Sequence, residues 1–352
     1  MAEKESNQYD FQDDSLSDTI REYEAVQFLS RSQMRRFHSD AIEYEGLIKT
    51  LKKRAVILRH LSVEKQRDKS LISLVSEKNS RILNYAPEEY LDDENFVFNI
   101  ARRQNMSYAS ERLRSDRDFM KSLIKEKPML LVYGSKEIRD DYDIVLTAAW
   151  KDGRSIKFGS ERLRGDENIV CTAIMQEGKS YRFASSAAKD NDRIAKFAVS
   201  LDGTLIRYVS DRLKDDRELV ISAITQNPSA FQYISKDKRS DLDIVKFVLE
   251  KDHSLLQYAD TSVRNNEDFV LPYIEKDYEI FQYCAFKIRD NKEIAKKVVS
   301  KDGLMLYSVS RRLKNDMEVV TIAVEQNPKA RYYASIRIKK ANRWPYNGWY
   351  YS

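Results

Sequence analysis

Apolar residues recur along this chain in a pattern that repeats every 25 residues. In each repeat they fall at the third, fourth, seventh and eighth places after an Asp or Asn, a spacing that marks one face of an α-helix. The repeat that opens at Asp166 shows this pattern with Ile169, Val170, Ala173 and Ile174. The spacing predicts an amphipathic helix at the start of every repeat.

The Asp or Asn that opens each repeat is its anchor, and positions are numbered from the anchor as zero. Eight anchors follow one another at intervals of 25 residues: Asp141, Asp166, Asn191, Asp216, Asp241, Asn266, Asn291 and Asp316. Upstream, Asp116 lies 25 residues before Asp141, Asp93 lies 23 before Asp116, and Asp68 lies 25 before Asp93. We therefore count eleven repeats, of which the one from Asp93 is two residues short.

Start and stop signals delimit the helix of each repeat. The anchor side chain can accept a hydrogen bond from an unpaired N–H group of the first turn, so the helix should begin just after it. A Gly or Pro at position 12 should end the helix after about three turns, and seven repeats have one there: Pro128, Gly153, Gly178, Gly203, Pro228, Gly303 and Pro328. Apolar residues at positions 15, 18 and 22 predict a second helix, and the aromatic residue that is usual at position 17 should pack against the next repeat.

A hairpin of two such helices is too small to bury its own apolar face, and stacking against neighbouring repeats supplies the core. The composition suits helices, because only 9 Gly and 6 Pro occur in 352 residues and 33% of the residues are charged. We predict an all-α protein, an α-solenoid of about eleven 25-residue two-helix repeats over residues 68–340.

The two ends of the chain do not keep the pattern. Residues 1–18 should form a flexible acidic N-terminus, and 19–67 a helical N-terminal cap region with one degenerate repeat near Glu43. A separate functional domain is the alternative for 19–67. The aromatic C-terminal tail, 341–352, is a candidate partner-binding tip, and the alternative is that its rings fold back over the last repeat. Its candidate binding residues are Trp344, Tyr346, Trp349, Tyr350 and Tyr351.

The repeat resembles that of the family called domain of unknown function 4116, as DRELVISAITQNPSAFQYIS (216–235) and DMEVVTIAVEQNPKARYYAS (316–335) show. The resemblance covers about 68–340 and implies no assigned activity. Similar repeats occur in secreted effectors of intracellular bacteria, in protists and in large viruses, so a role as an effector delivered into a host cell stays open. The chain departs from the family pattern at Asp260 and Ala285, which replace the usual Ser, and at Ser308, which replaces the aromatic residue.

Position 23 carries a basic residue in repeat after repeat, and these candidate polyanion-binding residues form the position-23 row: Arg114, Arg139, Arg164, Lys189, Lys214, Arg239, Arg264, Arg289, Lys314 and Lys339. In a regular stack the row could track the phosphates of a polyanion or nucleic acid. The alternative is structural, because each residue lies near the end of its helix and close to the next anchor, whose acid it could bridge.

Two further rows of recurring residues, an Arg and a Ser, are better explained by a structural role than by a catalytic or binding role. Arg112, Arg162, Arg212 and Arg312 recur mostly in alternate repeats, which duplication of a pair of repeats explains more simply than a functional arginine row. The Ser at position 19 lacks a repeated His that could act as its base, so local hydrogen bonding is its expected role. The three His and two Cys have no spacing suited to zinc, and we predict no catalytic residue, metal or cofactor.

Charge and cysteine content narrow the function only slightly. The net charge of +5 does not by itself imply a nucleic-acid partner. Two cysteines suggest a reducing compartment, and the absence of a leader or of a long apolar run leads us to expect a cytoplasmic protein without a membrane span. We predict a non-enzymatic interaction or scaffold protein that binds a protein partner through the solenoid surface or the tail. The alternative is polyanion binding through the position-23 row, and the sequence leaves the oligomeric state open.

Overall fold

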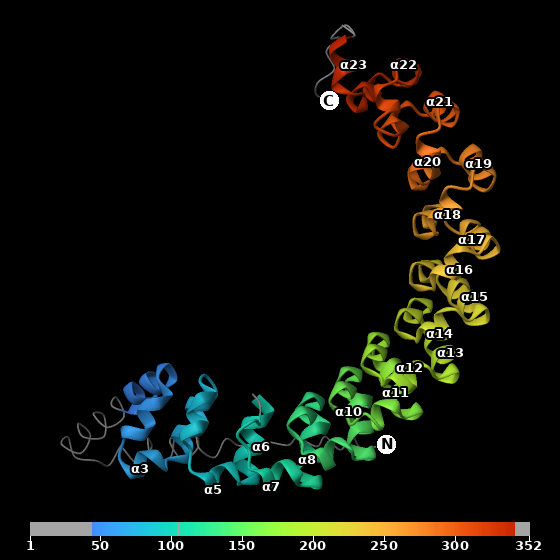
Figure 1. The fold of residues 1–352 in the computed structure, drawn as a ribbon. Helices are drawn as coiled ribbons and strands as arrows, with labels where there is room; N and C mark the ends of the chain where they lie inside the picture. Colours follow the sequence, from blue (N-terminus) through green and yellow to red (C-terminus); the bar gives the residue numbers. More distant parts are fainter. Residues whose placement is uncertain (1–43, 104–105, 342–352) are drawn as a thin grey trace, which may run out of the picture. The chain divides into compact units, whose positions relative to one another are not determined.

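The structure is a computed structural model, and it describes residues 44–103 and 106–341 (Figure 1). The chain divides into two compact parts, Met1–Leu163 and Arg164–Ser352, and each part is described by itself. Every element in the described ranges is a helix, which confirms the predicted all-α class. No helix in these ranges is both long and apolar enough to cross a membrane. The predicted segment 1–18, residues 19–43 of the predicted cap region, and all but the first residue of the predicted tail 341–352 lie outside the described residues.

Each of the eleven predicted anchors is followed directly by an α-helix. In the first part these long helices are α4 (Lys69–Ser76), α6 (Glu94–Arg103), α8 (Arg117–Glu126) and α10 (Tyr142–Lys151). In the second part they are α11 (Glu167–Gln176), α13 (Asp192–Leu201), α15 (Arg217–Gln226), α17 (Leu242–Leu249), α19 (Glu267–Lys276), α21 (Lys292–Lys301) and α22 (Met317–Gln326).

The anchors cap these helices as the sequence predicts. The side-chain oxygen of Asp166 accepts a hydrogen bond from the N–H of Ile169 at 3.0 Å, and that of Asp216 accepts one from Leu219 at 2.7 Å. An extended backbone at the anchor is what lets its side chain reach back to the first turn. The capped start therefore follows from a single residue type at position 0.

The Gly at position 12 allows a close approach between repeats in two places. A Cβ atom on Gly203 would lie 2.1 Å from the carbonyl oxygen of Ala223 on the next long helix, and one on Gly303 would lie equally close to that of Ala323. The side chain of Gln226 also accepts a hydrogen bond from the N–H of Gly203 at 2.5 Å. At these positions the next helix fills the space that a side chain would need.

The second half of the repeat is divided more finely than the single helix expected. In most repeats it consists of a 3-10 helix at positions 12–17, extended residues at positions 18 and 19, and a one-turn α-helix at positions 20–23, which the repeats from Asp141 and Asn291 replace with a 3-10 helix at positions 22–24. The Ser at position 19 explains the break, because its side chain caps the short helix from outside: Ser185 Oγ accepts a hydrogen bond from the N–H of Ala188 at 3.2 Å.

These elements recur through both parts. The first part has η2 (Ala55–His60), α3 (Val63–Gln66), η3 (Ser80–Tyr85), α5 (Glu88–Leu91), α7 (Glu111–Ser115), η4 (Pro128–Tyr133), α9 (Lys136–Arg139) and η5 (Gly153–Phe158), and η6 spans Leu163–Gly165. The second part has η7 (Gly178–Phe183), α12 (Ser186–Lys189), η8 (Gly203–Tyr208), α14 (Asp211–Lys214), η9 (Pro228–Tyr233), α16 (Lys236–Ser240), η10 (His253–Tyr258), α18 (Thr261–Arg264), η11 (Tyr278–Tyr283), α20 (Phe286–Arg289), η12 (Gly303–Tyr307), η13 (Leu313–Asn315), η14 (Pro328–Tyr333) and α23 (Ile336–Ala341).

A main-chain hydrogen bond joins successive repeats. The N–H at position 19 donates to the carbonyl oxygen at position 23 of the preceding repeat, as in Ser160 to Arg139 at 2.7 Å and Ser185 to Arg164 at 2.8 Å. The bond also forms where position 19 is not Ser, since Asp260 and Ala285 donate in the same way. The extended residues thus bring each repeat back to the one before it.

The core consists of the four apolar positions of the long helices together with positions 15 and 22. In α13, Ile194, Ala195, Ala198 and Val199 are completely buried. Most of the 3-10 helices add a buried apolar side chain at position 15, such as Phe231, whereas η14 has the half-buried Arg331 there. Burial of a large apolar side chain stabilises the folded state by about 1.5–3 kcal/mol, so every repeat depends on surfaces that its neighbours provide.

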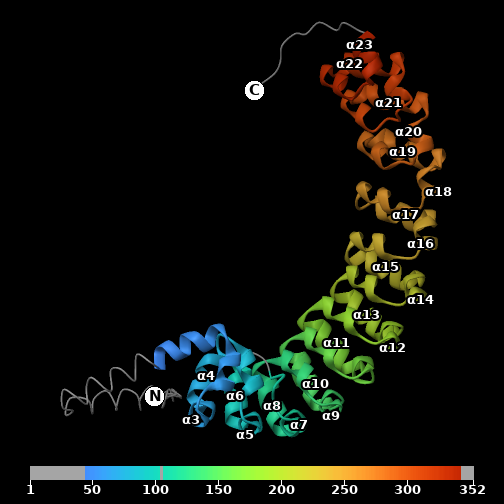
Figure 2. The same ribbon diagram turned by 60° about the vertical axis from the view of Figure 1, so that its left-hand side comes forward.

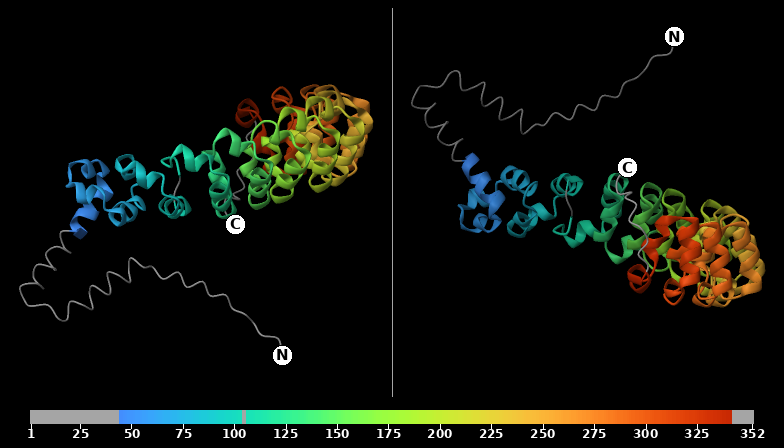
Figure 3. Two further views of the ribbon diagram at one scale, coloured as in Figure 1. Left: turned by 90° about the horizontal axis from the view of Figure 1, so that it is seen from below. Right: turned by 90° about the horizontal axis from the view of Figure 1, so that it is seen from above.

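The elements form two rows in the second part. Its long helices follow one another along one side and its short helices along another (Figures 1 and 2). Seen from below or above, the repeats of this part lie largely one over the other, as stacked copies should (Figure 3). In the first part, a helix over 44–53 followed by η2 and α3 gives the same order of elements, where the degenerate repeat near Glu43 was expected.

Candidate binding surface along the short helices

The position-23 row lies at the ends of the short helices, and all ten of its residues are half-buried. Four arginines in the second part donate from Nη1 to the carbonyl oxygen at position 17 of the next repeat: Arg164 to Phe183 at 3.3 Å, Arg239 to Tyr258 at 3.1 Å, Arg264 to Tyr283 at 3.4 Å and Arg289 to Ser308 at 3.2 Å. Three lysines donate to position 16 of their own repeat: Lys189 to Arg182, Lys314 to Tyr307 and Lys339 to Tyr332. These cations therefore cap the ends of 3-10 helices.

The acidic partners expected for this row are not those that the structure shows. Within the described residues, the row has a single ion pair, between Lys214 and Asp211 at 3.2 Å. The anchor acids pair with residues at position 1 of the preceding repeat instead, as Arg117 does with Asp141 at 2.7 Å. Backbone carbonyls lie closer to the row than the anchors do, because the extended residues fold the next 3-10 helix over it.

Several arginines of the row keep unused hydrogen-bonding capacity. The Nε atoms of Arg114, Arg139, Arg164 and Arg239 are buried without a hydrogen-bond partner. In the second part, burial lowers the pKa of Lys189, and the nearby charges of Arg164 and Lys214 lower it further. An anion placed here would find cations that are not neutralised by carboxylates.

The arginines at position 21 form clamps between repeats. Arg212 Nε donates to Asp190 Oδ1 at 3.0 Å, and Ser210 Oγ donates to the same oxygen. The hydrogen bond from Ser210 and then that from Arg212 lower the pKa of Asp190. The same clamp of position 24, position 19 and position 21 recurs four times: Asp92 with Ser110 and Arg112, Asp140 with Ser160 and Arg162, Asp290 with Ser310 and Arg312, and Asn315 with Ser335 and Arg337.

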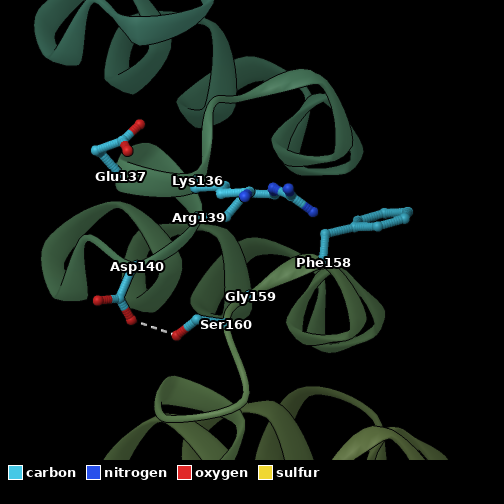
Figure 4. A pocket seen from close by; sticks show the side chains of 7 residues that line it. All are labelled: Lys136, Glu137, Arg139, Asp140, Phe158, Gly159 and Ser160. Carbon is cyan, nitrogen blue, oxygen red and sulfur yellow. Dashed lines mark hydrogen bonds between the residues drawn. The ribbon is translucent and has the colours of Figure 1, made fainter.

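A pocket of about 540 Å³ opens in the first part between the short helix of one repeat and the end of the next 3-10 helix (Figure 4). Its lining residues are Lys136, Glu137, Arg139, Asp140, Phe158, Gly159 and Ser160. The guanidinium group of Arg139 extends across the pocket toward Phe158 (Figure 4). Asp140 is already engaged, since hydrogen bonds from Ser160 and Arg162 lower its pKa.

The same place in an earlier repeat holds a second pocket, of about 490 Å³. It is lined by Glu88, Glu89, Leu91, Asp92, Tyr108 and Ser110. Leu91 occupies position 23, where the first pocket has Arg139, and Glu88 occupies position 20, where it has Lys136. The same arrangement of a short helix and the next 3-10 helix therefore forms both pockets. The one at Arg139 has two cations at positions 20 and 23, and the one at Leu91 has an acidic and an apolar residue there.

A further row, at position 16, was not recognised in the sequence. In the second part it reads Arg182, Arg207, Gln232, Gln257, Gln282, Tyr307 and Tyr332 along successive 3-10 helices. The guanidinium carbon of Arg182 lies 4.5 Å from the ring centroid of Phe183, and that of Arg207 lies 4.0 Å from that of Tyr233. The basic residues of this row could have been found from their recurrence directly before the aromatic residue at position 17.

The remaining predictions concern the tail and chemistry. Trp344, Tyr346, Trp349, Tyr350 and Tyr351 lie outside the described residues, so the binding-tip prediction stays open. Within the described ranges, no three His, Cys, Asp or Glu side chains gather in a way that could hold a metal ion. Both cysteines are unpaired thiols, and burial raises the pKa of Cys284 to about 12. Such a thiol is a poor nucleophile.

A family model described as Domain of unknown function (DUF4116) matches six stretches of the chain: 104–139, 116–149, 141–187, 191–237, 241–289 and 291–339. Together these stretches cover more than half of the sequence. The last three begin at the anchors Asn191, Asp241 and Asn291, so the family unit spans two of the 25-residue repeats. No curated protein and no solved structure matches the chain.

Proposed function

The chain belongs to the family described as Domain of unknown function (DUF4116), and because that description assigns no activity, we propose from the surface alone that the protein is a non-enzymatic scaffold for a protein partner. One observation carries the proposal: a pocket of the same construction recurs in the array with a different lining. Both pockets contain carboxylates and an aromatic ring, but the first has Lys136 and Arg139 where the second has Glu88 and Leu91.

Two pockets that form at the same place in different repeats but differ in their side chains suit a ligand that is itself a chain. Stacked repeats present extended surfaces on which consecutive pockets meet consecutive side chains of a partner. The described side chains also favour binding over catalysis. The Ser hydroxyls at position 19 are used in capping and in clamps, and the carboxylates of the clamps are held by Arg and Ser.

Affinity capture with the full tagged chain tests the proposal. Wild type and the variant Lys136→Glu with Arg139→Gln would each be used on a cell lysate, with and without nuclease, and the proteins recovered would be identified by mass spectrometry. The expected result is a protein partner that survives nuclease and is reduced by the pocket variant. The matched control Lys151→Glu, on an exposed residue of α10, should leave recovery unchanged.

A second candidate function, binding of a nucleic acid or another polyanion, is favoured by the position-23 row, which has a single ion pair with a carboxylate among the described residues. Its affinity would fall steeply with salt, because phosphate contacts release counterions. Recovery that vanishes with nuclease in the capture experiment would favour this candidate and contradict the scaffold proposal.

A further inference from the structure

Five basic residues at positions 16 and 23 of three successive repeats in the second part form what we call the basic strip: Arg164, Arg182, Lys189, Arg207 and Lys214. Arg164 donates to the carbonyl oxygen of Phe183, and Lys189 donates to that of Arg182 at 2.8 Å, so rows 16 and 23 meet here. Burial first, and then the charges of Arg164 and Lys214, lower the pKa of Lys189.

Few acidic groups oppose the strip. The 3-10 helices η7 and η8, with sequences GKSYRF and GTLIRY, contain no Asp or Glu. The ion pair of Lys214 involves Asp211, whose side chain is fully exposed, and such pairs contribute little. Asp190, at the end of α12, is already held by Ser210 and Arg212.

Arg182 and Arg207 each lie beside an aromatic ring. Each guanidinium group packs against the ring of a neighbour, Phe183 for Arg182 and Tyr233 for Arg207. Packing on a ring occupies a face of the planar group and leaves its N–H edge for an acceptor, where carboxylates bind with two parallel hydrogen bonds. Neither guanidinium has an ion pair or a side-chain hydrogen bond among the residues that the structure describes.

The strip is short. Beyond Arg207, position 16 becomes Gln232, Gln257 and Gln282, so both rows are basic in the repeats from Asp166 and Asn191, and Arg164 extends the strip into a third repeat. At roughly 10 Å per stacked repeat this is about 30 Å, the length of about nine extended residues at roughly 3.3 Å each. A polyanion that followed the whole array would require the coincidence to continue.

We propose that the basic strip binds a short, extended segment of a protein partner that carries Asp or Glu at about every third residue. The inference rests on the proposed function and specifies the chemistry of the partner. A single-stranded nucleic acid fits less well, because bases bind by stacking on aromatic faces, and the rings of Phe183 and Tyr233 are already covered by guanidinium groups.

Binding of a fluorescent peptide of about ten residues, with Glu at every third place, tests the inference by anisotropy at low salt. The variant Arg182→Gln with Arg207→Gln introduces the residue that the next three repeats carry at position 16, so the fold should be kept. Affinity should fall about tenfold, as expected when two charged contacts of modest strength are lost. The matched control Arg193→Gln with Lys246→Gln removes the same charge from exposed positions of α13 and α17 and should change affinity less than about twofold.

The comparison ligands make the outcome decisive. A peptide with Gln in place of Glu should bind weakly or not at all. Unchanged affinity in the strip variant, no binding of the Glu peptide, or tighter strip-dependent binding of a single-stranded oligonucleotide of similar length would each overturn the inference. A nuclease-resistant partner captured equally by wild type and strip variant would leave the scaffold proposal standing while the strip is rejected.

Discussion

Asn265 has a side-chain oxygen that is buried without a hydrogen-bond partner in the structure as described. In six other repeats the residue at this position, 24, accepts a hydrogen bond from a Ser hydroxyl at position 19 of the next repeat, as Asn315 does from Ser335 at 2.6 Å. Here position 19 is Ala285, which also leaves the short helix α20 without a side-chain cap. A single missing hydroxyl thus removes two hydrogen bonds.

The substitution Ala285→Ser should therefore stabilise the protein. The new hydroxyl would donate to Asn265 and accept from the first turn of α20, and the free energy of unfolding should rise by about 1 kcal/mol. Urea denaturation followed by circular dichroism measures the change. In an Asn265→Ala background only the capping contribution should remain, and an equal gain in both backgrounds would contradict the assignment of the buried oxygen.

At the scale of elements, the clamps hold short helices of neighbouring repeats together. Each brings an Asp or Asn at the end of one short helix to a Ser and an Arg at the start of the next. An Arg at position 21 occurs only where the preceding repeat ends in Asp or Asn at 24, but the reverse does not hold, since Asp215 is followed by Asp237 and Asn265 by Lys287. The sequences SERLR (110–114 and 160–164), SDRLK (210–214) and SRRLK (310–314) thus supply the Ser and the Arg of a clamp, and the preceding repeat supplies its acid.

The clamps should make stability depend on pH. Their aspartates have lowered pKa values in the folded state, through hydrogen bonds from Ser and then from Arg. The stabilisation is therefore complete above the unfolded pKa of about 4 and is lost as the pH falls through the folded pKa. The four-fold variant Asp92→Asn, Asp140→Asn, Asp190→Asn and Asp290→Asn should stay folded, because Asn315 makes the same contacts without a charge.

Urea midpoints measured between about pH 6 and pH 3 check this prediction. The midpoint of the variant should fall less steeply than that of wild type, while the two proteins should resemble each other more closely in acid. Parallel curves would show that other carboxylates, such as the anchors, determine the acid sensitivity.

At the scale of the molecule, stability should be local, because each repeat completes its core with its neighbours. Val199 in α13 and Val299 in α21 occupy the same position 8, and both are completely buried. Truncation to Ala removes similar contacts at two places in one part of the chain. Comparing the two substitutions therefore distinguishes a local loss of stability from a loss of stability throughout this part of the chain.

Hydrogen exchange should respond regionally to these two substitutions. Val199→Ala, at a cost of about 1–2 kcal/mol, should speed exchange in α11, α13 and α15 and leave α22 unchanged. Val299→Ala should do the reverse, with faster exchange in α19, α21 and α22. Uniform acceleration along the second part in either variant would mean that this part unfolds as one cooperative unit.

Much of the fold could be predicted from the sequence, because the anchor, the stop signal and the apolar spacing all repeat. The second half of the repeat was harder to predict, because the sequence does not distinguish a Ser inside a helix from a Ser that caps one. The partners of Arg164 and Lys189 could not be read from spacing, because they are backbone carbonyls, and every residue has one. The position-24 partner of Arg212 could have been found, since the two residues occur together.

The main-chain bond from position 19 to position 23 has a consequence for the history of the array. Because it uses only an N–H and a carbonyl group, this bond can form between any two repeats whatever side chains they carry, unlike the clamps. Whole repeats, singly or in the pairs that the family unit spans, could be gained or lost while the connection stays intact. The outward positions 16, 20 and 23 are then left to change with the ligand, so that the length and the specificity of such a protein can evolve separately.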